Sequence, residues 1–281
     1  MRHQTFNTFW HGPELSPLHW ACLSSFIERG HRLRLFSYQP VTVPDGVERE
    51  DASSVLPQAE LFDFQGSASS FSNLFRYELM LEEGGWWVDA DVYCLREDLP
   101  DCRYAWARED DDFVNGAILR FPAGDPALAA IRASARSIGP SVAIQGQLGP
   151  RLLTDHLSGK DWSGHFGSTR AFYPIHWLEA HRLWTRDDEA FVRTKCEASS
   201  FVHLWGMMFR YFGIDPGLAP PEGSFLHHIQ GRAAFPRALR PLDAETERQT
   251  LLAIRAFLDT EEYRERAWRV LGHGVLPPAP R

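Results

Sequence analysis

The chain has 281 residues, of which 44% are hydrophobic and 23% charged, which is the composition of a globular protein with a full core. Its formal net charge of -8 argues against nucleic acid as the main partner. No apolar run is long enough to cross a bilayer and no signal-peptide core follows the first residues, so we expect a cytoplasmic protein. The four cysteines show no CxxC spacing and are expected to be reduced and mostly buried: Cys22, Cys94, Cys102 and Cys196.

The first segments predict a parallel α/β sheet. Residues 5–10 are β-prone, and residues 18–29 carry apolar side chains at helical spacing before Gly30. Residues 32–38 then alternate between apolar and polar side chains, as in a second strand. A strand, a helix and a strand in this order predict parallel pairing with helices on the faces of the sheet. Residues 40–64 hold proline and aspartate turns and predict no regular element.

A helix is predicted over residues 67–83. Serines at its start are candidates for the N-cap, and Gly84 is placed to end it. Asn73 and Arg76, spaced i, i+3, are expected to lie together on the side opposite the apolar stripe of the helix.

The most informative segment follows this helix. An apolar run over residues 84–88 leads from a glycine turn into Asp89 and Asp91, whose side chains share one face if the backbone is extended. Two carboxylates aimed at one point repel each other unless a cation lies between them or one is protonated. Hard divalent cations take oxygen ligands and are commonly completed by substrate phosphates. The segment therefore predicts a Mg²⁺ or Mn²⁺ site for a diphosphate at the end of a buried strand, where ligands of α/β sheets gather. The alternative is a strand end that is merely capped by acids.

Later segments predict further α/β elements and one acidic turn. Residues 92–95 are expected to continue the acid-bearing strand or to pair beside it. The run Asp110-Asp111-Asp112 repeats the acid spacing in a polar context and is interpreted as a solvated turn. The remaining predictions are a strand over 115–122, helices over 126–138 and 150–157, β elements over 171–174 and 200–205, and helices from 243 onward that end in a proline-rich tail.

The residues around the acid pair resemble a known family. Ser72-Asn73-Leu74-Phe75-Arg76-Tyr77, followed by residues 81–91, is similar to the glycosyltransferases with a sugar-binding DXD motif. That group has the GT-A fold and includes capsular polysaccharide transferases, mannosyltransferases and the clostridial glucosylating toxins. Its pattern is a helix with Ser-Asp-x-x-Arg, a Gly-Gly, and an aromatic, apolar strand that ends in D-x-D. The resemblance implies a GT-A-type α/β fold with a Rossmann-like, mainly parallel sheet flanked by helices. It places a catalytic domain in residues 1–235 and a helical extension packed on it in residues 236–281.

The resemblance also implies roles for the central residues. Asp91 would bind the Mn²⁺ or Mg²⁺ directly, Asp89 would contact the donor ribose or the metal and its water, and Arg76 would contact the donor sugar or phosphate. The family has an acid three residues before the arginine, whereas this chain has Asn73. An asparagine still hydrogen-bonds sugar hydroxyls but adds no negative charge, so the identity of the donor sugar stays open. A solvated helix face is the alternative for both helix residues.

Four further residues are assigned through the same resemblance, each with a plain alternative. Asn115 is similar to the family's asparagine at the donor sugar, or else belongs to an Asn-Gly turn. Gln147, assigned to the donor site, precedes a Gly-Pro helix start that in the family lies near the acceptor, or else it is part of a simple helix cap. His203 resembles a late metal-ligating histidine, or else is a core or surface histidine. Trp10 is expected to stack on the nucleotide base, or else to pack in the core.

The function that the resemblance implies is transfer of a sugar. A metal-dependent hexosyltransferase would move it from a nucleotide-sugar, with UDP-sugar as the first expectation, to a glycan or lipid-linked acceptor in polysaccharide biosynthesis, with retention at the anomeric carbon. The basic residues Arg264, Arg266 and Arg269 suggest a peripheral membrane contact, although interleaved glutamates favour a packing helix. Two alternatives remain. One is a non-catalytic carbohydrate-binding relative, and the other is a phosphohydrolase of the haloacid-dehalogenase kind, which would carry Thr or Val where this chain has Tyr93.

Overall fold

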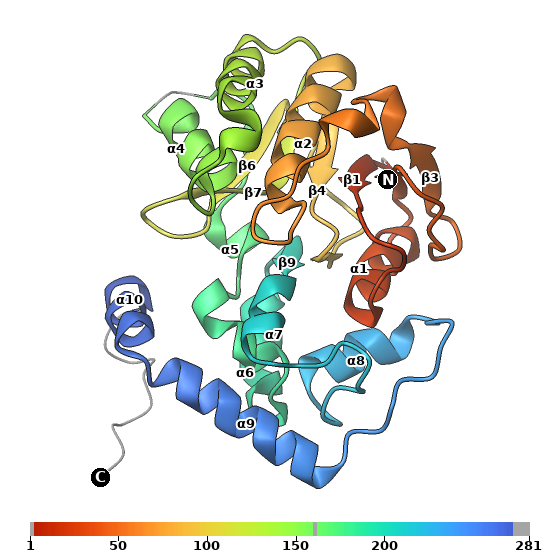
Figure 1. The fold of residues 1–281 in the computed structure, drawn as a ribbon, viewed down its shortest axis with the longest axis vertical. Helices are drawn as coiled ribbons and strands as arrows, with labels where there is room; N and C mark the ends of the chain where they lie inside the picture. The colour runs from red at the N-terminus through yellow and green to blue at the C-terminus, as the bar shows by residue number, and fades with distance from the viewer. Residues whose placement is uncertain (1–2, 160–161, 272–281) are drawn as a thin grey trace.

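A seven-stranded sheet forms the centre of the protein. The computed structural model describes residues 3–159 and 162–271 (Figure 1). The strands lie in the order β3-β2-β1-β4-β7-β6-β8, with β7 antiparallel to both of its neighbours and the other neighbouring pairs parallel. Their bounds are β1 (Thr5–Phe9), β2 (Arg32–Ser37), β3 (Glu48–Asp51), β4 (Gly85–Val88), β6 (Tyr104–Arg108), β7 (Val114–Phe121) and β8 (His165–Phe166). The expected α/β class with a mainly parallel sheet is confirmed.

Helices cover both faces of the sheet, and the strand side chains alternate between them. Trp86 and Val88 of β4 belong to the hydrophobic cluster that includes helix α1 (Pro17–Glu28). Trp87, between them, belongs to the opposite cluster with helices α2 (Ser69–Glu83), α3 (Pro126–Ile138) and α4 (Leu152–Leu157), which lie side by side in the upper part of Figure 1. Because both faces of β4 are buried, the strand is apolar throughout, as the sequence indicated.

The ends of helix α2 fix where the acid-bearing strand begins. Its N-cap is Ala68, without a side-chain hydrogen bond, so the predicted serine N-cap is wrong. At the other end Gly84 terminates the helix with φ of 69°, as predicted. A Cβ atom at Gly84 would lie 2.5 Å from the Ala123 backbone nitrogen, so the tight passage from helix to strand accepts only glycine.

A second sheet lies beside the first. Strands β5 (Val92–Cys94) and β9 (Phe201–His203) pair antiparallel, with Val92 opposite His203. The prediction that residues 92–95 continue the acid-bearing strand or pair beside it is therefore wrong, because the chain turns away from β4 before β5 begins. Leaving β9, the chain passes through Trp205 in the left-handed region, with φ of 54°, and so the predicted β element over 200–205 is shorter than expected.

The β element predicted over residues 171–174 is also wrong. Thr169–Phe172 form the short helix α5, whose first turn is capped by the Ser168 side chain. This cap lies four residues before Phe172, the first of the two aromatic residues in the predicted β element. The aromatic side chains are buried, as a strand would require, but the backbone around them is helical. Local capping chemistry outweighed β propensity here.

The remaining elements are mostly short helices. A π-helical turn over Gln147–Arg151 leads into α4. The 3₁₀-helices are Ala52–Ser54, Gln58–Glu60, Gly139–Ser141, Trp177–Leu183 and Arg186–Asp188. The C-terminal half adds α6 (Glu189–Cys196), α7 (Gly206–Tyr211), α8 (Phe225–Arg232), α9 (Ala244–Leu258) and α10 (Glu261–Leu271). All four cysteines are buried and unpaired, as expected.

The C-terminal helices pack on the rest of the protein. Ile254 of α9 lies in the same cluster as the α1 core, and Tyr263 of α10 donates its hydroxyl proton to the Leu178 carbonyl at 2.6 Å. The Arg266 guanidinium lies 4.8 Å from the centre of the Trp177 ring. These contacts favour the packing-helix interpretation of α10, while the boundary at residue 235 and a membrane contact stay predictions. The proline-rich tail lies outside the described residues.

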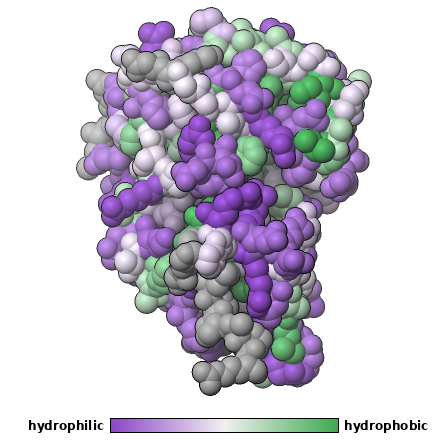
Figure 2. All heavy atoms as spheres, turned by 90° about the vertical axis from the view of Figure 1, so that its left-hand side faces the viewer, coloured by the Kyte–Doolittle hydropathy of each residue, from purple (hydrophilic) through white to green (hydrophobic). Residues whose placement is uncertain are grey.

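Two observations bear on the surface. None of the helices in residues 3–159 and 162–271 combines the length and apolar character that a membrane crossing requires. Figure 2 shows the side of the molecule that lies to the left in Figure 1, where hydrophilic residues dominate and apolar residues form small, scattered patches. That side has the character of an ordinary solvated surface.

Candidate functional site

The two acids follow β4 in a tight turn. The backbone N–H of Val92 donates to the Asp89 carbonyl at 3.0 Å, which closes the turn. Our expectation of an extended segment through Asp89 and Asp91 is thus wrong, because the strand ends at Val88. The acids nevertheless remain at the carboxyl end of β4, between the ends of β1 and β7, because the Asp89 N–H donates to the Ala117 carbonyl at 2.8 Å. Convergence of the two carboxylates comes from the turn and not from strand alternation.

Asp89, Asp91 and His203 form a cluster of potential metal ligands. Each offers one ligand atom, and these atoms all lie within 4.8 Å of one another. His203 arrives there because β9 pairs with β5 in a register that places it opposite Val92. Two carboxylate oxygens and one imidazole nitrogen suit a divalent cation, since carboxylates favour Mg²⁺ and Mn²⁺ and imidazole is the commonest nitrogen ligand. The residues present therefore fit the cation that the sequence predicted.

Charge within this cluster is balanced between an acid and a base. His203 Nε2 lies 3.1 Å from Asp91 Oδ1, and the Gly206 N–H donates to Asp91 Oδ2 at 2.8 Å. Burial opposes ionisation of Asp91, but the neighbouring imidazole outweighs it and holds the pKa of Asp91 well below its usual range. Burial likewise disfavours the charged form of His203, but the carboxylate outweighs it and raises the pKa of His203. Each group thus stabilises the charged form of the other, and a cation bound here would take over the positive charge.

Arg76 reaches the same point from helix α2. Its side chain is 4% exposed, and its Nη2 lies 3.2 Å from Asp89 Oδ1. Its Nη1 donates to the Gly116 carbonyl, and the guanidinium lies 5.2 Å from the centre of the Trp87 ring. The alternative of a solvated helix face is wrong for Arg76. Because Asp89, the Gly116 carbonyl and the Trp87 ring all contact it, the Arg76 guanidinium faces the acid pair in a fixed position.

Asn73, predicted to lie together with Arg76 opposite the apolar stripe of the helix, has different contacts from Arg76. The Asn73 amide donates to the Ser69 carbonyl at 2.9 Å on its own helix. A Cβ atom at Gly149 would lie 2.8 Å from Asn73 Oδ1, so Asn73 lies against the turn before α4. Of the two helix residues, Arg76 contacts the acid pair and Asn73 contacts the turn before α4, and a contact between Asn73 and a donor sugar stays a prediction.

Asn115 lies inside strand β7, so the alternative of an Asn-Gly turn is wrong. Its side chain is buried and fully engaged: Nδ2 donates to Glu109 Oε2 at 2.5 Å, and Oδ1 accepts from the Ala117 N–H at 2.7 Å. A Cβ atom at Gly116 would lie 2.6 Å from Arg76 Nη1, so the close approach of the guanidinium requires glycine there. Asn115 therefore lies next to the backbone carbonyls of Gly116 and Ala117, which accept hydrogen bonds from Arg76 and Asp89. Its role at a donor sugar stays a prediction.

Trp10 lies at the end of β1, on the same edge of the sheet. The centre of its ring is 4.5 Å from that of His19, whose Nδ1 lies 2.7 Å from the Ser16 hydroxyl. Burial lowers the pKa of His19 to about 4, against the opposing influence of the Asp91 carboxylate. Trp10 and a neutral His19 thus form the β1 side of the site, although stacking on a base is untested.

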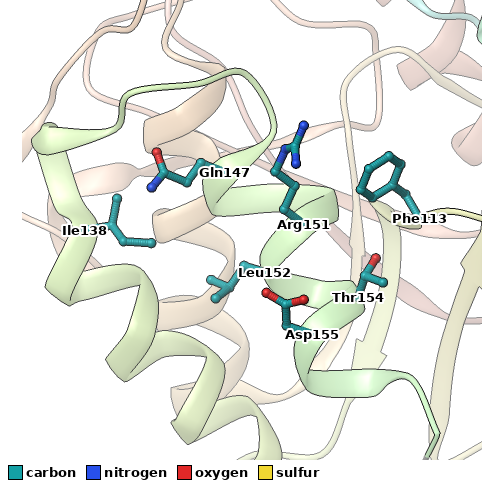
Figure 3. A pocket seen from close by; sticks show the side chains of 7 residues that line it. All are labelled: Phe113, Ile138, Gln147, Arg151, Leu152, Thr154 and Asp155. Carbon is teal, nitrogen blue, oxygen red and sulfur yellow. The ribbon is translucent and has the colours of Figure 1, made fainter.

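Gln147 lies apart from the cluster. It lines a cavity of about 330 Å³ whose wall includes none of the three potential metal ligands. Figure 3 shows Gln147 and Arg151 on the helical turn before α4, with the Phe113 ring facing Arg151. The Gln147 side-chain oxygen accepts from the Ala143 N–H at 2.8 Å. A donor contact from Gln147 remains a prediction.

The second acidic run is not the solvated turn that we predicted. Asp111 and Asp112 are exposed, but the Asp110 side chain is 3% exposed and lies 3.4 Å from His176 Nε2. Glu109, which precedes the run, is buried against Asn115. Sequence reasoning missed Glu109, His19, His176 and Gly206. Of these four residues, only Gly206 lies close in sequence to a predicted site residue, since it follows His203 by three residues.

The fold and site together define an α/β protein with a candidate divalent-cation centre where β4 ends. No model of a known protein family matches the chain, and no curated protein matches its sequence. Among solved structures, the chain is similar to one described as "PaToxG Glycosyltransferase", with 14% identity and a TM-score of 0.44 over 56% of this chain and 70% of that chain. It is also similar to one described as the structure of a transferase mutant, with 11% identity and a TM-score of 0.37 over 58% of this chain and 90% of that chain. Each likeness covers little more than half of this chain.

Proposed function

We propose that the protein is a metal-dependent glycosyltransferase. It would move a sugar from a nucleotide-sugar, with UDP-sugar as the first candidate, to a hydroxyl of a glycan or lipid-linked acceptor. The observation that carries this proposal is the meeting of two carboxylates, an imidazole and a buried guanidinium at the carboxyl end of β4. Asp89, Asp91 and His203 are the residues that would hold Mn²⁺ or Mg²⁺. In open α/β sheets this edge is where phosphate-bearing ligands bind.

The chemistry follows from the charge that sugar transfer creates. As the bond between sugar and diphosphate breaks, negative charge builds on the departing oxygen. A bound divalent cation supplies Lewis-acid stabilisation of that charge. Arg76 adds a fixed positive charge, and because its guanidinium is already held by Gly116 and Asp89, it needs no rearrangement at the moment of reaction.

Retention of the anomeric configuration is part of the proposal. Attack by the acceptor from the face of the leaving group requires no protein nucleophile, which agrees with a site whose acids are directed at the cation. The remaining donor contacts are assigned to Trp10, Asn73, Asn115 and Gln147.

Hydrolysis of the donor in the absence of acceptor tests the proposal. With a panel of UDP- and GDP-sugars and saturating Mn²⁺, we expect slow hydrolysis by the wild type and a loss of about 100-fold or more in Asp91→Asn, the range found when one charge-stabilising group is removed. Asp111→Asn is the matched control, because it neutralises an exposed acid of the other acidic run. Hydrolysis that survives unchanged in Asp91→Asn would contradict the proposal.

A non-catalytic nucleotide-sugar binder is the competing function. Titration calorimetry followed by analysis of the donor separates the two: a binder would take up a UDP-sugar together with Mn²⁺ and release it intact. Recovery of the unchanged donor after prolonged incubation, with tight binding, would favour this alternative.

A further inference from the structure

The turn between β6 and β7 places a buried carboxylate behind the candidate site. Glu109 directly follows β6, and because β4 and β6 both pair antiparallel with β7, its position is on the same edge of the sheet as the acid pair. Glu109 is 8% exposed, and the Glu109 N–H donates to the Phe113 carbonyl at 2.9 Å. Burial of a carboxyl group costs free energy unless the group is hydrogen-bonded. Its partner is the Asn115 amide, whose Nδ2 lies 2.5 Å from Glu109 Oε2.

The bond to Glu109 decides which way the Asn115 amide points. A side-chain amide has a donor end and an acceptor end, and the Glu109 oxygen that faces it, Oε2, accepts from Asn115 Nδ2. Glu109 therefore draws the NH₂ end toward itself and leaves Oδ1 to accept from the Ala117 N–H at 2.7 Å. A reversed amide would place two acceptors together and two donors together. Glu109 thus favours the amide orientation in which Oδ1 accepts from the Ala117 N–H, and this adds to the ladder bonds that β7 makes with β4 and β6.

That backbone segment holds two residues of the candidate site. The Gly116 carbonyl accepts from Arg76 Nη1, and the Ala117 carbonyl accepts from the Asp89 N–H at 2.8 Å. The path from Glu109 to the guanidinium and to the first acid runs through the Asn115 amide and the backbone of residues 115–117 to these two hydrogen bonds. In metalloproteins, groups that hydrogen-bond to the metal ligands orient those ligands in the same way.

The neighbouring acid keeps Glu109 pointing inward. Asp110 Oδ1 accepts from the backbone N–H groups of Asp112 and Phe113, each at 2.9 Å, which closes the turn after Glu109. Its Oδ2 lies 3.4 Å from His176 Nε2. Asp110 therefore stabilises the turn that follows Glu109.

We infer that Glu109 is a positioning residue for the candidate site, which orients Arg76 and Asp89 through Asn115 and the backbone of residues 116 and 117. The consequence for cation binding rests on the proposed function, whereas the orientation of Arg76 does not. Glu109 makes no hydrogen bond to Asp89, Asp91 or Arg76 among the described residues, and it reaches Arg76 and Asp89 through Asn115 and the backbone of residues 115–117.

Two measurements on Glu109→Ala test the inference. We expect the affinity for Mn²⁺ alone, by titration calorimetry, to fall about tenfold, the lower end of the loss seen for partners of metal ligands. We also expect the Arg76 Nε–H resonance in the metal-free protein, assigned by its loss in Arg76→Lys, to shift and exchange faster. Glu109→Gln retains an acceptor oxygen and is expected to restore both. Asp125→Ala is the matched control: Asp125 is buried, accepts two backbone N–H bonds and follows the far end of β7. It should lower the melting temperature and leave both readouts unchanged.

The outcomes separate the inference from the proposed function. Unchanged Mn²⁺ affinity together with an unchanged Arg76 resonance in Glu109→Ala overturns the inference. If the wild type binds no Mn²⁺, the proposed function fails, and the Arg76 resonance still decides whether Glu109 positions it. Should Glu109→Ala not fold, Glu109→Asp decides in its place, because it withdraws the carboxylate by one methylene; the inference then requires weaker binding and a shifted resonance.

Discussion

Two acidic segments, one after β4 and one after β6, hold carboxyl groups whose pKa values shift in opposite directions. The segment after β4 brings Asp91 against an imidazole, which holds its pKa well below the usual range despite burial. The segment after β6 buries Glu109 against a neutral amide, and there burial prevails and raises its pKa. The Asp91 side chain is 18% exposed and Glu109 is 8% exposed, so both are largely shielded from water and burial alone does not distinguish them. What distinguishes them is the hydrogen-bond partner, which is an imidazole for Asp91 and a neutral amide for Glu109. The ionisation of an acidic side chain therefore depends on the groups that the fold brings opposite it.

The largest effect is expected where the two segments are coupled, at Gly116. A Cβ atom there would lie 2.6 Å from Arg76 Nη1 and 2.9 Å from the Leu153 side chain, so Gly116→Ala must displace the guanidinium. We predict a loss of donor hydrolysis of about 100-fold, similar to removal of a charge-stabilising group. Gly231→Ala is the control, since nothing lies within 4 Å of a Cβ atom at that position. Equal hydrolysis by both variants would remove Arg76 from the account.

The next effect concerns the imidazole that distinguishes the first segment. His203→Ala removes one potential ligand and the positive partner of Asp91, and we predict Mn²⁺ binding weakened about 10-fold to 100-fold by calorimetry. His228→Ala, whose side chain is 45% exposed, should bind as the wild type does. The comparison breaks if the two histidine variants bind Mn²⁺ equally.

A smaller effect is expected on the stability of the turn after β6. Asp110→Ala removes two bonds to backbone N–H groups and the contact with His176, so urea denaturation should show a loss of about 1–3 kcal/mol in the free energy of unfolding. The exposed Asp111→Ala should change it by no more than about 0.5 kcal/mol. Asp111→Ala should leave the Mn²⁺ affinity unchanged. A weakened affinity in Asp111→Ala would show that the second segment also binds the cation.

The smallest effect is a pH dependence of stability. Because the folded pKa of Glu109 is raised, the folded state binds more protons than the unfolded state above the ordinary carboxyl pKa of about 4.3. The free energy of unfolding of the wild type should therefore fall relative to Glu109→Gln as the pH rises from that value through the folded pKa. A pH series of urea denaturation curves measures this difference. A wild type that gains stability relative to Glu109→Gln as the pH rises would contradict a raised pKa of Glu109.

The sequence predicted the elements whose signals are local. The strand, helix and strand over residues 5–38 follow from periodicity, and Gly84 marks the end of α2 because only glycine accepts that backbone. Strand β3 and strand β6 were not predicted. Their side chains alternate in burial only because of the sheet around them. Short elements of this kind depend on neighbours that the sequence does not place side by side.

The candidate site divides along the same line. Asp89, Asp91 and Arg76 lie within one helix and the strand and turn that follow it, so their pattern is visible in the sequence. His203 is 112 residues from its partner Asp91, and only the resemblance to a family suggested it. Glu109 was hidden because a polar run predicts a solvated turn, and its burial depends on the pairing of β6 with β7. Burial of a polar side chain is a property of topology, which local sequence does not contain.

Crystals soaked with Mn²⁺ and UDP, and measured near the manganese absorption edge, test the central claim most directly. We predict one anomalous peak within coordination distance of Asp91, with Asp89 or His203 as a further ligand and the UDP diphosphate completing the coordination. Nucleotide bound without metal at this point, or a manganese peak that these three residues do not contact, would contradict the account.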